Sequence, residues 1–112
     1  MSKRQQSADV TSHELDKLDK LLEHRSRLGT CVLLADTDAM SFVSLKQLLK
    51  ETDGNMGAHL RKLEDAGYIR VSKRFENRMP ISWYRLTAKG TKALRTHLGG
   101  LETVIRNAKP KR

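Results

Sequence analysis

The stretch that decides the fold is TDGNMGAHLRKLEDAGYI, residues 52–69. Within it Met56, Leu60 and Leu63 recur at spacings of four and three residues, which places all three on one stripe of an α-helix. Gly67 is suited to end that helix, because glycine readily adopts the left-handed conformation that closes a C-terminus. The pattern therefore predicts a helix that packs on a core through this stripe, with an opposite face that takes no part in the core.

That opposite face combines small residues with residues that carry hydrogen-bonding or cationic groups. Gly54 and Ala58 would let the helix approach another surface closely, and Asn55 can both donate to and accept from the edge of a base. A helix N-terminus also favours the negative charge of phosphate. DNA binding is one interpretation of this face, and an ordinary solvent-exposed helix surface is the alternative. Three further side chains nearby can reach phosphate groups: His59, Arg61 and Lys62.

The distribution of charge favours a polyanionic partner. The chain of 112 residues has a formal net charge of +9. Residues 1–60 hold eight Lys or Arg and nine Asp or Glu, whereas residues 61–112 hold fourteen and four. The positive charge thus begins within the quoted helix and continues to the end of the chain, as in many proteins that bind nucleic acid. A basic surface that serves only solubility is the alternative. Only five aromatic residues are present, which argues against binding by base stacking on single strands.

Helical patterns precede the quoted stretch. Thr11 and Glu14 match a capping box and predict a helix over about 11–24. The segments that follow predict, in order, a helix over about 25–35, a stub of strand over 41–43 and a short helix from Ser44.

From Tyr68 onward apolar and polar residues alternate, which is the period of a β-strand. After a loop over residues 76–80, the segment ISWYRLT, residues 81–87, returns as a second strand. Tyr84 is expected to face the core, and Trp83 to pack against the terminal helices or a partner. Charged hairpins also protect strand edges from aggregation, so the charge here has an alternative explanation. Four residues cluster about the expected tip, where they could contact phosphates or the minor groove: Lys73, Arg74, Asn77 and Arg78.

Taken in chain order, these elements predict a mainly α fold with a small β-hairpin wing. This is an α+β protein of the winged helix-turn-helix type with extra N- and C-terminal helices. A helix pair followed directly by a basic hairpin indicates a winged helix-turn-helix more specifically than a helix pair alone does. A chain of this length makes one domain. The expected boundaries are a mobile N-terminus over 1–10, a single domain over 11–106 and a mobile basic tail over 107–112.

The segment NMGAHLRKLEDAGYIRV, residues 55–71, followed by WYRLTAKG, residues 83–90, resembles winged-helix transcriptional regulators of the ArsR and MarR type. The resemblance is strongest to small stand-alone regulators of bacteria and archaea and covers roughly residues 14–98. It implies a homodimer on a palindromic DNA operator. It also implies that the helix over about 53–66 lies in the major groove and that the wing, over about 68–86, lies on the backbone or in the minor groove.

By position, the resemblance implies DNA-facing roles for Asn55, Gly57, Ala58 and His59. Gly57 and Ala58 depart from the polar residues often found at these places. That departure shifts the weight of recognition from base readout to DNA shape and phosphate contacts.

The terminal helices carry more apolar residues than a winged-helix core needs. Thr87 can cap the last helix, in which Gly99 and Gly100 predict a bend or an end. The apolar stripes could pack on the core or form a two-fold dimer interface. The dimer is the stronger hypothesis, because a monomer of this size would have a small footprint on DNA. The residues expected at that interface are Leu15, Leu18, Leu22, Leu94, Leu98, Leu101 and Ile105.

Nothing in the sequence indicates an enzyme, a metal site or a cofactor. The four histidines are scattered, and no metalloprotease pair, phosphate-binding loop or nucleophile motif is present. Cys31 is the only cysteine, which excludes an internal disulfide and the cysteine pair of ArsR-type metal sensors, and we expect it to be a small buried side chain. The absence of a long apolar run or a signal peptide predicts no membrane partner and a cytoplasmic location.

These patterns together predict a homodimeric, sequence-specific, double-stranded DNA-binding transcriptional regulator, with any small-molecule effector unknown. Two alternatives remain: a winged-helix module for protein interaction, and a basic protein associated with RNA. Binding to a specific duplex in competition with bulk duplex would separate them.

Overall fold

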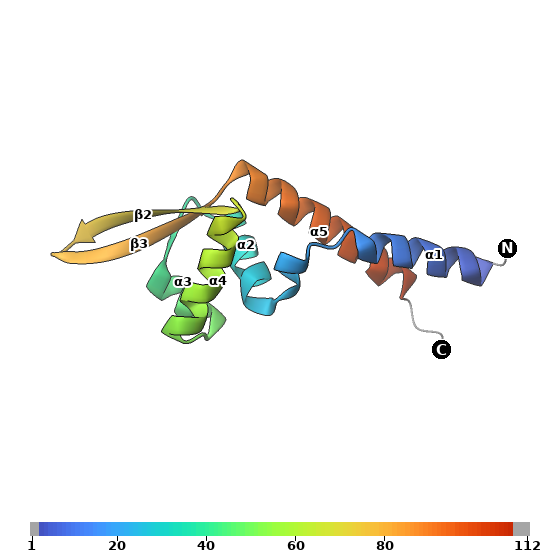
Figure 1. The fold of residues 1–112 in the computed structure, drawn as a ribbon, viewed down its shortest axis with the longest axis horizontal. Helices are drawn as coiled ribbons and strands as arrows, with labels where there is room; N and C mark the ends of the chain where they lie inside the picture. The colour runs from blue at the N-terminus through green and yellow to red at the C-terminus, as the bar shows by residue number, and fades with distance from the viewer. Residues whose placement is uncertain (1–2, 109–112) are drawn as a thin grey trace.

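The computed structural model describes residues 3–108, and the chain forms an elongated body of 66 × 28 × 22 Å. Its radius of gyration is 17.3 Å, whereas a compact domain of this length has about 13 Å. Figure 1 shows a winged-helix core at one end and a two-helix arm at the other. The elements are α1 (Lys3–Asp16), the 3₁₀ helix η1 (Lys20–Glu23), α2 (Arg25–Ala35), β1 (Met40–Ser41), α3 (Phe42–Leu49), α4 (Asp53–Asp65), β2 (Ile69–Glu76), β3 (Met79–Leu86) and α5 (Ala88–Asn107). The predicted mainly helical α+β fold with a small wing is confirmed.

The core is built where α2, α3, α4 and the base of the sheet meet. Met56, Leu60 and Leu63 of α4 are buried, as their spacing predicted. They join Leu45 of α3 and Leu22 of η1 in one apolar cluster. The burial of one complete stripe fixes the rotation of α4, so the opposite face must point to solvent.

Both ends of α4 are closed by local hydrogen bonds. The side chain of Thr52 accepts from the Asn55 amide at 3.1 Å. At the other end Gly67 has φ +80°, and its amide donates to the Glu64 carbonyl at 2.9 Å. The Tyr68 amide donates to the Leu63 carbonyl, also at 2.9 Å. This is the Schellman arrangement, so the predicted role of Gly67 in ending the helix is confirmed.

The sheet is antiparallel, with strand order β1-β3-β2. Tyr84 is buried, as predicted, and lies opposite Val71 on one side and Met40 on the other. The predicted loop over 76–80 is wrong, because strand pairing continues to Glu76 and Met79. Only Asn77 and Arg78 remain in the turn. Both have positive φ, 50° and 65°, as a tight hairpin turn requires.

The prediction for the N-terminus is also wrong in its boundaries. α1 begins at Lys3, so residues 3–10 are helical and Thr11 lies within the helix instead of capping it. α1 stops at Asp16, and the Asp19 side chain then caps η1 by accepting from the Leu21 amide at 2.9 Å. The backbone amide of Asp19 in turn donates to Nδ1 of the buried His97 at 3.0 Å. A contact with α5 therefore breaks the helix that the local pattern extended to residue 24.

α5 runs without a break through Gly99 and Gly100, contrary to the prediction of a bend or an end. The two glycines differ in their surroundings. A Cβ atom at Gly100 would lie 2.9 Å from Cδ2 of Leu18, so glycine here allows the segment after α1 to approach α5 closely. A Cβ atom at Gly99 would meet nothing within 4 Å. The expected tail over 107–112 lies outside the described residues, apart from the last residue of α5 and Ala108.

Candidate nucleic-acid interface

The solvent-facing side of α4 is open over its first two turns. A Cβ atom at Gly54 or Gly57 would meet nothing within 4 Å, and Asn55 and Ala58 are exposed. No packing requirement accounts for small residues at these positions. A large partner could therefore approach the helix backbone closely along this side. The expected contact residues that lie on the solvent side are Asn55, Gly57, Ala58, Arg61 and Lys62.

Acidic groups of α4 are kept away from the centre of this side. Asp53, in the first turn, forms an ion pair with Lys46 of α3 at 2.8 Å. The acid stabilises the helix N-terminus, and Lys46 offsets its charge toward an approaching anion. Glu64 and Asp65 are exposed at the C-terminal end, beyond the first two turns. The charge that faces a partner at the start of α4 is therefore not dominated by carboxylates.

His59 differs from the other expected contacts, because its imidazole is turned into the protein. Nε2 lies 3.2 Å from a carboxylate oxygen of Glu51, and Nδ1 lies 3.1 Å from the guanidinium of Arg27. The ring also packs on that of His24, with 4.1 Å between centroids. With both nitrogens engaged, His59 holds α4 against α2 and is not free to contact phosphate. Sequence reasoning missed these partners because they come from other elements.

This cluster also determines the protonation of His59. Burial, with His24 as the next cause, lowers the pKa of His59 below its ordinary value of 6.5. Arg27 can only donate, so Nδ1 accepts from it and the single ring proton lies on Nε2, from which it is donated to Glu51. Glu51 also accepts a hydrogen bond from the Ser26 hydroxyl, which lowers the pKa of that carboxyl. A neutral histidine thus links α4 to the start of α2.

The four residues expected at the wing are all exposed in the outer part of the hairpin. Asn77 and Arg78 form the turn itself, which lies at the end of the wing farthest from α5 in Figure 1. Asparagine tolerates positive φ better than most residues, which suits the first turn position. The remaining two, Lys73 and Arg74, are neighbours on β2 and project from opposite faces, because side chains alternate along a strand.

Two further arginines that sequence reasoning did not single out lie at the base of this hairpin. The strand register places Arg70 directly opposite Arg85, and Arg74 lies on the same face four pairs nearer to the turn. Like charges opposite each other destabilise a sheet, so a function for the charge explains the pair better than stability does. Alternation along β2 places Arg70 on the face of Arg74, and the strand register adds Arg85 to them. The three arginines line a hollow of about 430 Å³ together with Val71, Ser72 and Lys73.

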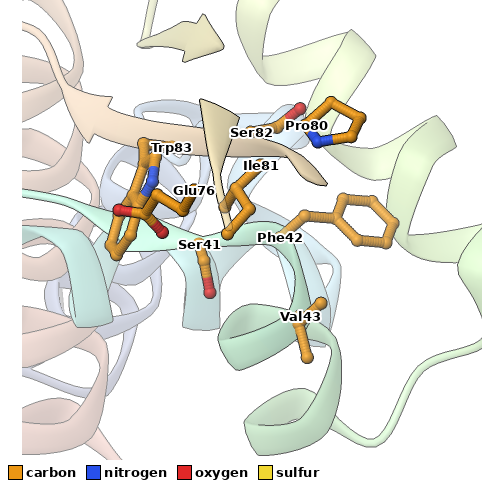
Figure 2. A pocket seen from close by; sticks show the side chains of 8 residues that line it. All are labelled: Ser41, Phe42, Val43, Glu76, Pro80, Ile81, Ser82 and Trp83. Atoms are coloured by element: carbon orange, nitrogen blue, oxygen red, sulfur yellow. The ribbon is translucent and has the colours of Figure 1, made fainter. Parts of the chain in front are cut away.

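Trp83 lies near the base of the wing. It pairs with Ser41 of β1 and lines a pocket of about 390 Å³ between β3 and the start of α3, and its contact with the terminal helices or a partner stays a prediction. Phe42, Ile81 and Glu76 also line this pocket (Figure 2). The indole Nε1 is buried without a hydrogen-bond partner in the described part of the chain. Trp83 thus braces the base of the wing against α3.

The structure divides the residues expected at the dimer interface into two groups. Leu22 and Leu94 are buried in the core of the single chain and cannot contact a second copy, which corrects their assignment. Leu18 and Leu101 are half-buried. The remaining three are exposed on the arm: Leu15 by 48%, Leu98 by 41% and Ile105 by 69%.

Other chemistries find no support among residues 3–108. No group of three or more His, Cys, Asp or Glu side chains there could hold a metal ion. Cys31 is buried, as expected, and burial raises the pKa of its thiol to about 12, so it is unreactive at neutral pH. Within the same residues no helix is both long and apolar enough to cross a bilayer.

Comparison with known proteins shows the family of the chain. A family model described as a winged helix DNA-binding domain matches residues 26–105. An uncharacterised protein of Methanocaldococcus jannaschii is 29% identical over 79 residues, which cover 70% of this chain and 86% of that protein. A transcriptional regulator homologue from Pyrococcus horikoshii has a TM-score of 0.79 and 27% identity over 88% of this chain and 99% of that one.

A more distant structural neighbour was solved with DNA bound. Sco3205, a MarR family transcriptional regulator from Streptomyces coelicolor in complex with DNA, has a TM-score of 0.65. The identity is 20% over 93% of this chain and 69% of that one, so the likeness concerns the fold alone. The predicted resemblance to winged-helix regulators is confirmed, and the family and fold are those of transcriptional regulators and not of enzymes.

Proposed function

Because the chain belongs to the winged helix DNA-binding domain family, we propose that it is a transcriptional regulator that binds specific double-stranded DNA as a homodimer. In this proposal α4 enters the major groove and the wing contacts the adjacent backbone or minor groove. The observation that carries it is the open side of α4, where Gly54, Gly57 and Ala58 leave room for the helix to approach base edges.

The exposed polar side chains of α4 divide into one that can read bases and two that can position the helix. Asn55, in the first turn, has an amide that can bond an adenine edge. Arg61 and Lys62 lie farther along the helix, where they can reach phosphates on either side of the groove. Arg70 and Arg85 extend the positive surface onto the wing. His59 contributes by positioning α4, through its contacts with α2 and the turn before α4.

The homodimer is supported by the arm. Leu15, Leu98 and Ile105 are exposed there, although burying apolar side chains is the main source of stability in a small protein. A second copy joined through this arm by a two-fold axis would bury them. The two α4 helices should then lie about 34 Å apart, one turn of DNA. The DNA complex of the Streptomyces coelicolor neighbour supports duplex DNA as the partner.

The test begins with selection of bound sequences from random duplexes, followed by measurement of affinity for the selected duplex at several salt concentrations. Asn55→Ala should relax discrimination at one base position. Lys62→Ala should weaken binding to all duplexes similarly and reduce the slope of log K against log salt by about one. Arg95→Ala removes one exposed charge from α5 and serves as the matched control. Equal affinity for selected duplex, bulk duplex and RNA would contradict the proposal.

A further inference from the structure

The end of the wing carries two large apolar side chains that no intramolecular contact explains. Phe75 is 80% exposed and Met79 is 63% exposed. Their neighbour Ile81, one step nearer to the base of the wing, lines the pocket beside Trp83 instead (Figure 2). The apolar character of the outer wing is therefore not an extension of the core. It needs a partner outside the chain.

The strand register shows that both faces of the wing tip are apolar. Phe75 lies directly opposite Pro80, so these two rings share one face. Met79 lies opposite Glu76 in the next pair, which points to the other face. A flat protein surface would cover only one face of a hairpin. A groove with two walls would cover both.

The charges around this tip suit a groove bordered by phosphates. Lys73 shares a face with Phe75, and Arg74 projects from the opposite face. Arg78 lies in the turn itself. Glu76 is the only acidic residue in the two strands and their turn, and it also lines the pocket beside Trp83. Each apolar face is thus accompanied by a cation that could reach a backbone phosphate.

We propose that the wing tip is an apolar wedge that enters the minor groove of the bound duplex, with Phe75 and Met79 packed against the deoxyribose walls. This inference rests on the proposed function and identifies what the wing does there. Two paired strands are about 4.8 Å apart, and the minor groove is only about 6 Å wide. Their side chains can enter only if the groove opens. Apolar wedges open it by partly unstacking a base step, which bends the duplex away from the wedge.

The wedge has a signature that separates it from electrostatic binding. Contacts between apolar side chains and deoxyribose release no counterions, so their loss should change affinity without changing its salt dependence. Loss of a phosphate contact changes both. The double variant Phe75→Ala/Met79→Ala should therefore bind the selected duplex roughly tenfold or more weakly at every salt concentration, with an unchanged slope. Arg78→Ala should instead lower the slope by about one.

DNA bending provides the second measurement. Fluorescence energy transfer between the ends of a labelled duplex should report a bend with the wild-type protein and a smaller bend with the double variant. Val32→Ala, at an exposed apolar position on α2, is the matched control and should bind and bend as wild type. Because Phe75 and Met79 are exposed, the double variant should unfold at the wild-type urea concentration, so weaker binding would not reflect misfolding.

Three results would overturn the wedge while leaving the proposed function intact, provided that the wild-type protein binds the selected duplex. They are wild-type affinity of the double variant, an affinity loss that vanishes at high salt, or a loss of dimerisation that shows the tip to be covered by a second copy. If the wild-type protein binds no duplex selectively, the proposed function itself fails.

Discussion

The two halves of α5 differ in what they do with their apolar residues. In the first half, residues 88–97, Gly90, Leu94 and His97 are buried, and the helix belongs to the winged-helix core. In the second half, residues 98–107, Leu98 and Ile105 remain exposed while the helix packs along α1 (Figure 1). One continuous helix thus contributes buried residues to the core at one end and exposes apolar residues to solvent at the other. The proposed homodimer would account for this difference, because a second copy would bury the apolar residues of the arm.

The largest effect is expected at Leu94 in the core half. Leu94→Ala removes a side chain that is only 5% exposed and should lower the free energy of unfolding by about 2–5 kcal/mol. Leu98→Ala, one turn farther on, should cost less than about 1 kcal/mol at a protein concentration low enough to dissociate a dimer. Urea unfolding of both variants measures the difference. Equal losses of unfolding free energy in the two variants would show that the two halves of α5 do not differ in packing.

Gly90 and Gly99 offer a second matched pair within α5. A Cβ atom at Gly90 would lie 2.1 Å from the Tyr68 carbonyl oxygen and 2.8 Å from Cδ1 of Leu86. Gly90→Ala must therefore push the start of α5 off the sheet, at a cost of about 3 kcal/mol. Gly99→Ala meets no atom and should stabilise the helix by up to about 1 kcal/mol. Thermal melts of the two variants should shift in opposite directions.

The arm should respond to charge through assembly and not through folding. Leu98→Glu places a charge on an exposed apolar position, so it should leave the fold intact but weaken self-association by roughly tenfold or more. Leu48→Glu, on an exposed position of α3, is the control and should not alter association. Sedimentation equilibrium at micromolar concentration makes the comparison. A wild-type monomer under these conditions would show that the arm has another purpose.

The smallest effect should come from pH, and it should affect the winged-helix core and not the arm. The pKa of His59 is lowered in the folded protein, chiefly by burial, so the unfolded chain takes up a proton first as the pH falls. The stabilising contribution is complete above the unfolded pKa near 6.5 and is lost as the pH falls through the lower folded value. Stability should therefore decrease from pH 7.5 to 5.5, and His59→Gln should make that decrease shallower.

Urea unfolding at the two pH values measures this change in wild type and variant, with sedimentation as the companion experiment. Protonation within the contact between α2 and α4 should leave the exposed arm unaffected, so association should not vary with pH in the same range. An identical pH dependence of stability in the variant would show that His59 does not cause the effect.

The parts of the fold that the sequence predicted correctly depend on neighbours along the chain. The spacing of Met56, Leu60 and Leu63 determined which side of α4 is buried, and Gly67 marked where the helix ends. The parts that failed depend on partners far away in the sequence. The stop in α1 follows from a contact between Asp19 and His97, 78 residues apart, and no local pattern contains that information.

The candidate site shows the same division. Periodicity alone placed Asn55, Ala58 and Lys62 on the side of α4 away from the core, and one-sided charge indicated a nucleic acid. Only the folded chain turned His59 inward, because its partners come from α2 and from the turn before α4. Only the strand register placed Arg70 opposite Arg85.

By itself the sequence determined the order of the core elements, the buried stripe of α4 and the basic character of the protein, because these follow from spacing and composition. The tertiary structure alone decided which leucines are buried in the core and which stay exposed on the arm. It also placed apolar residues on both faces of the wing tip. Burial is a property of how distant elements pack, so it can be read only after the chain has folded.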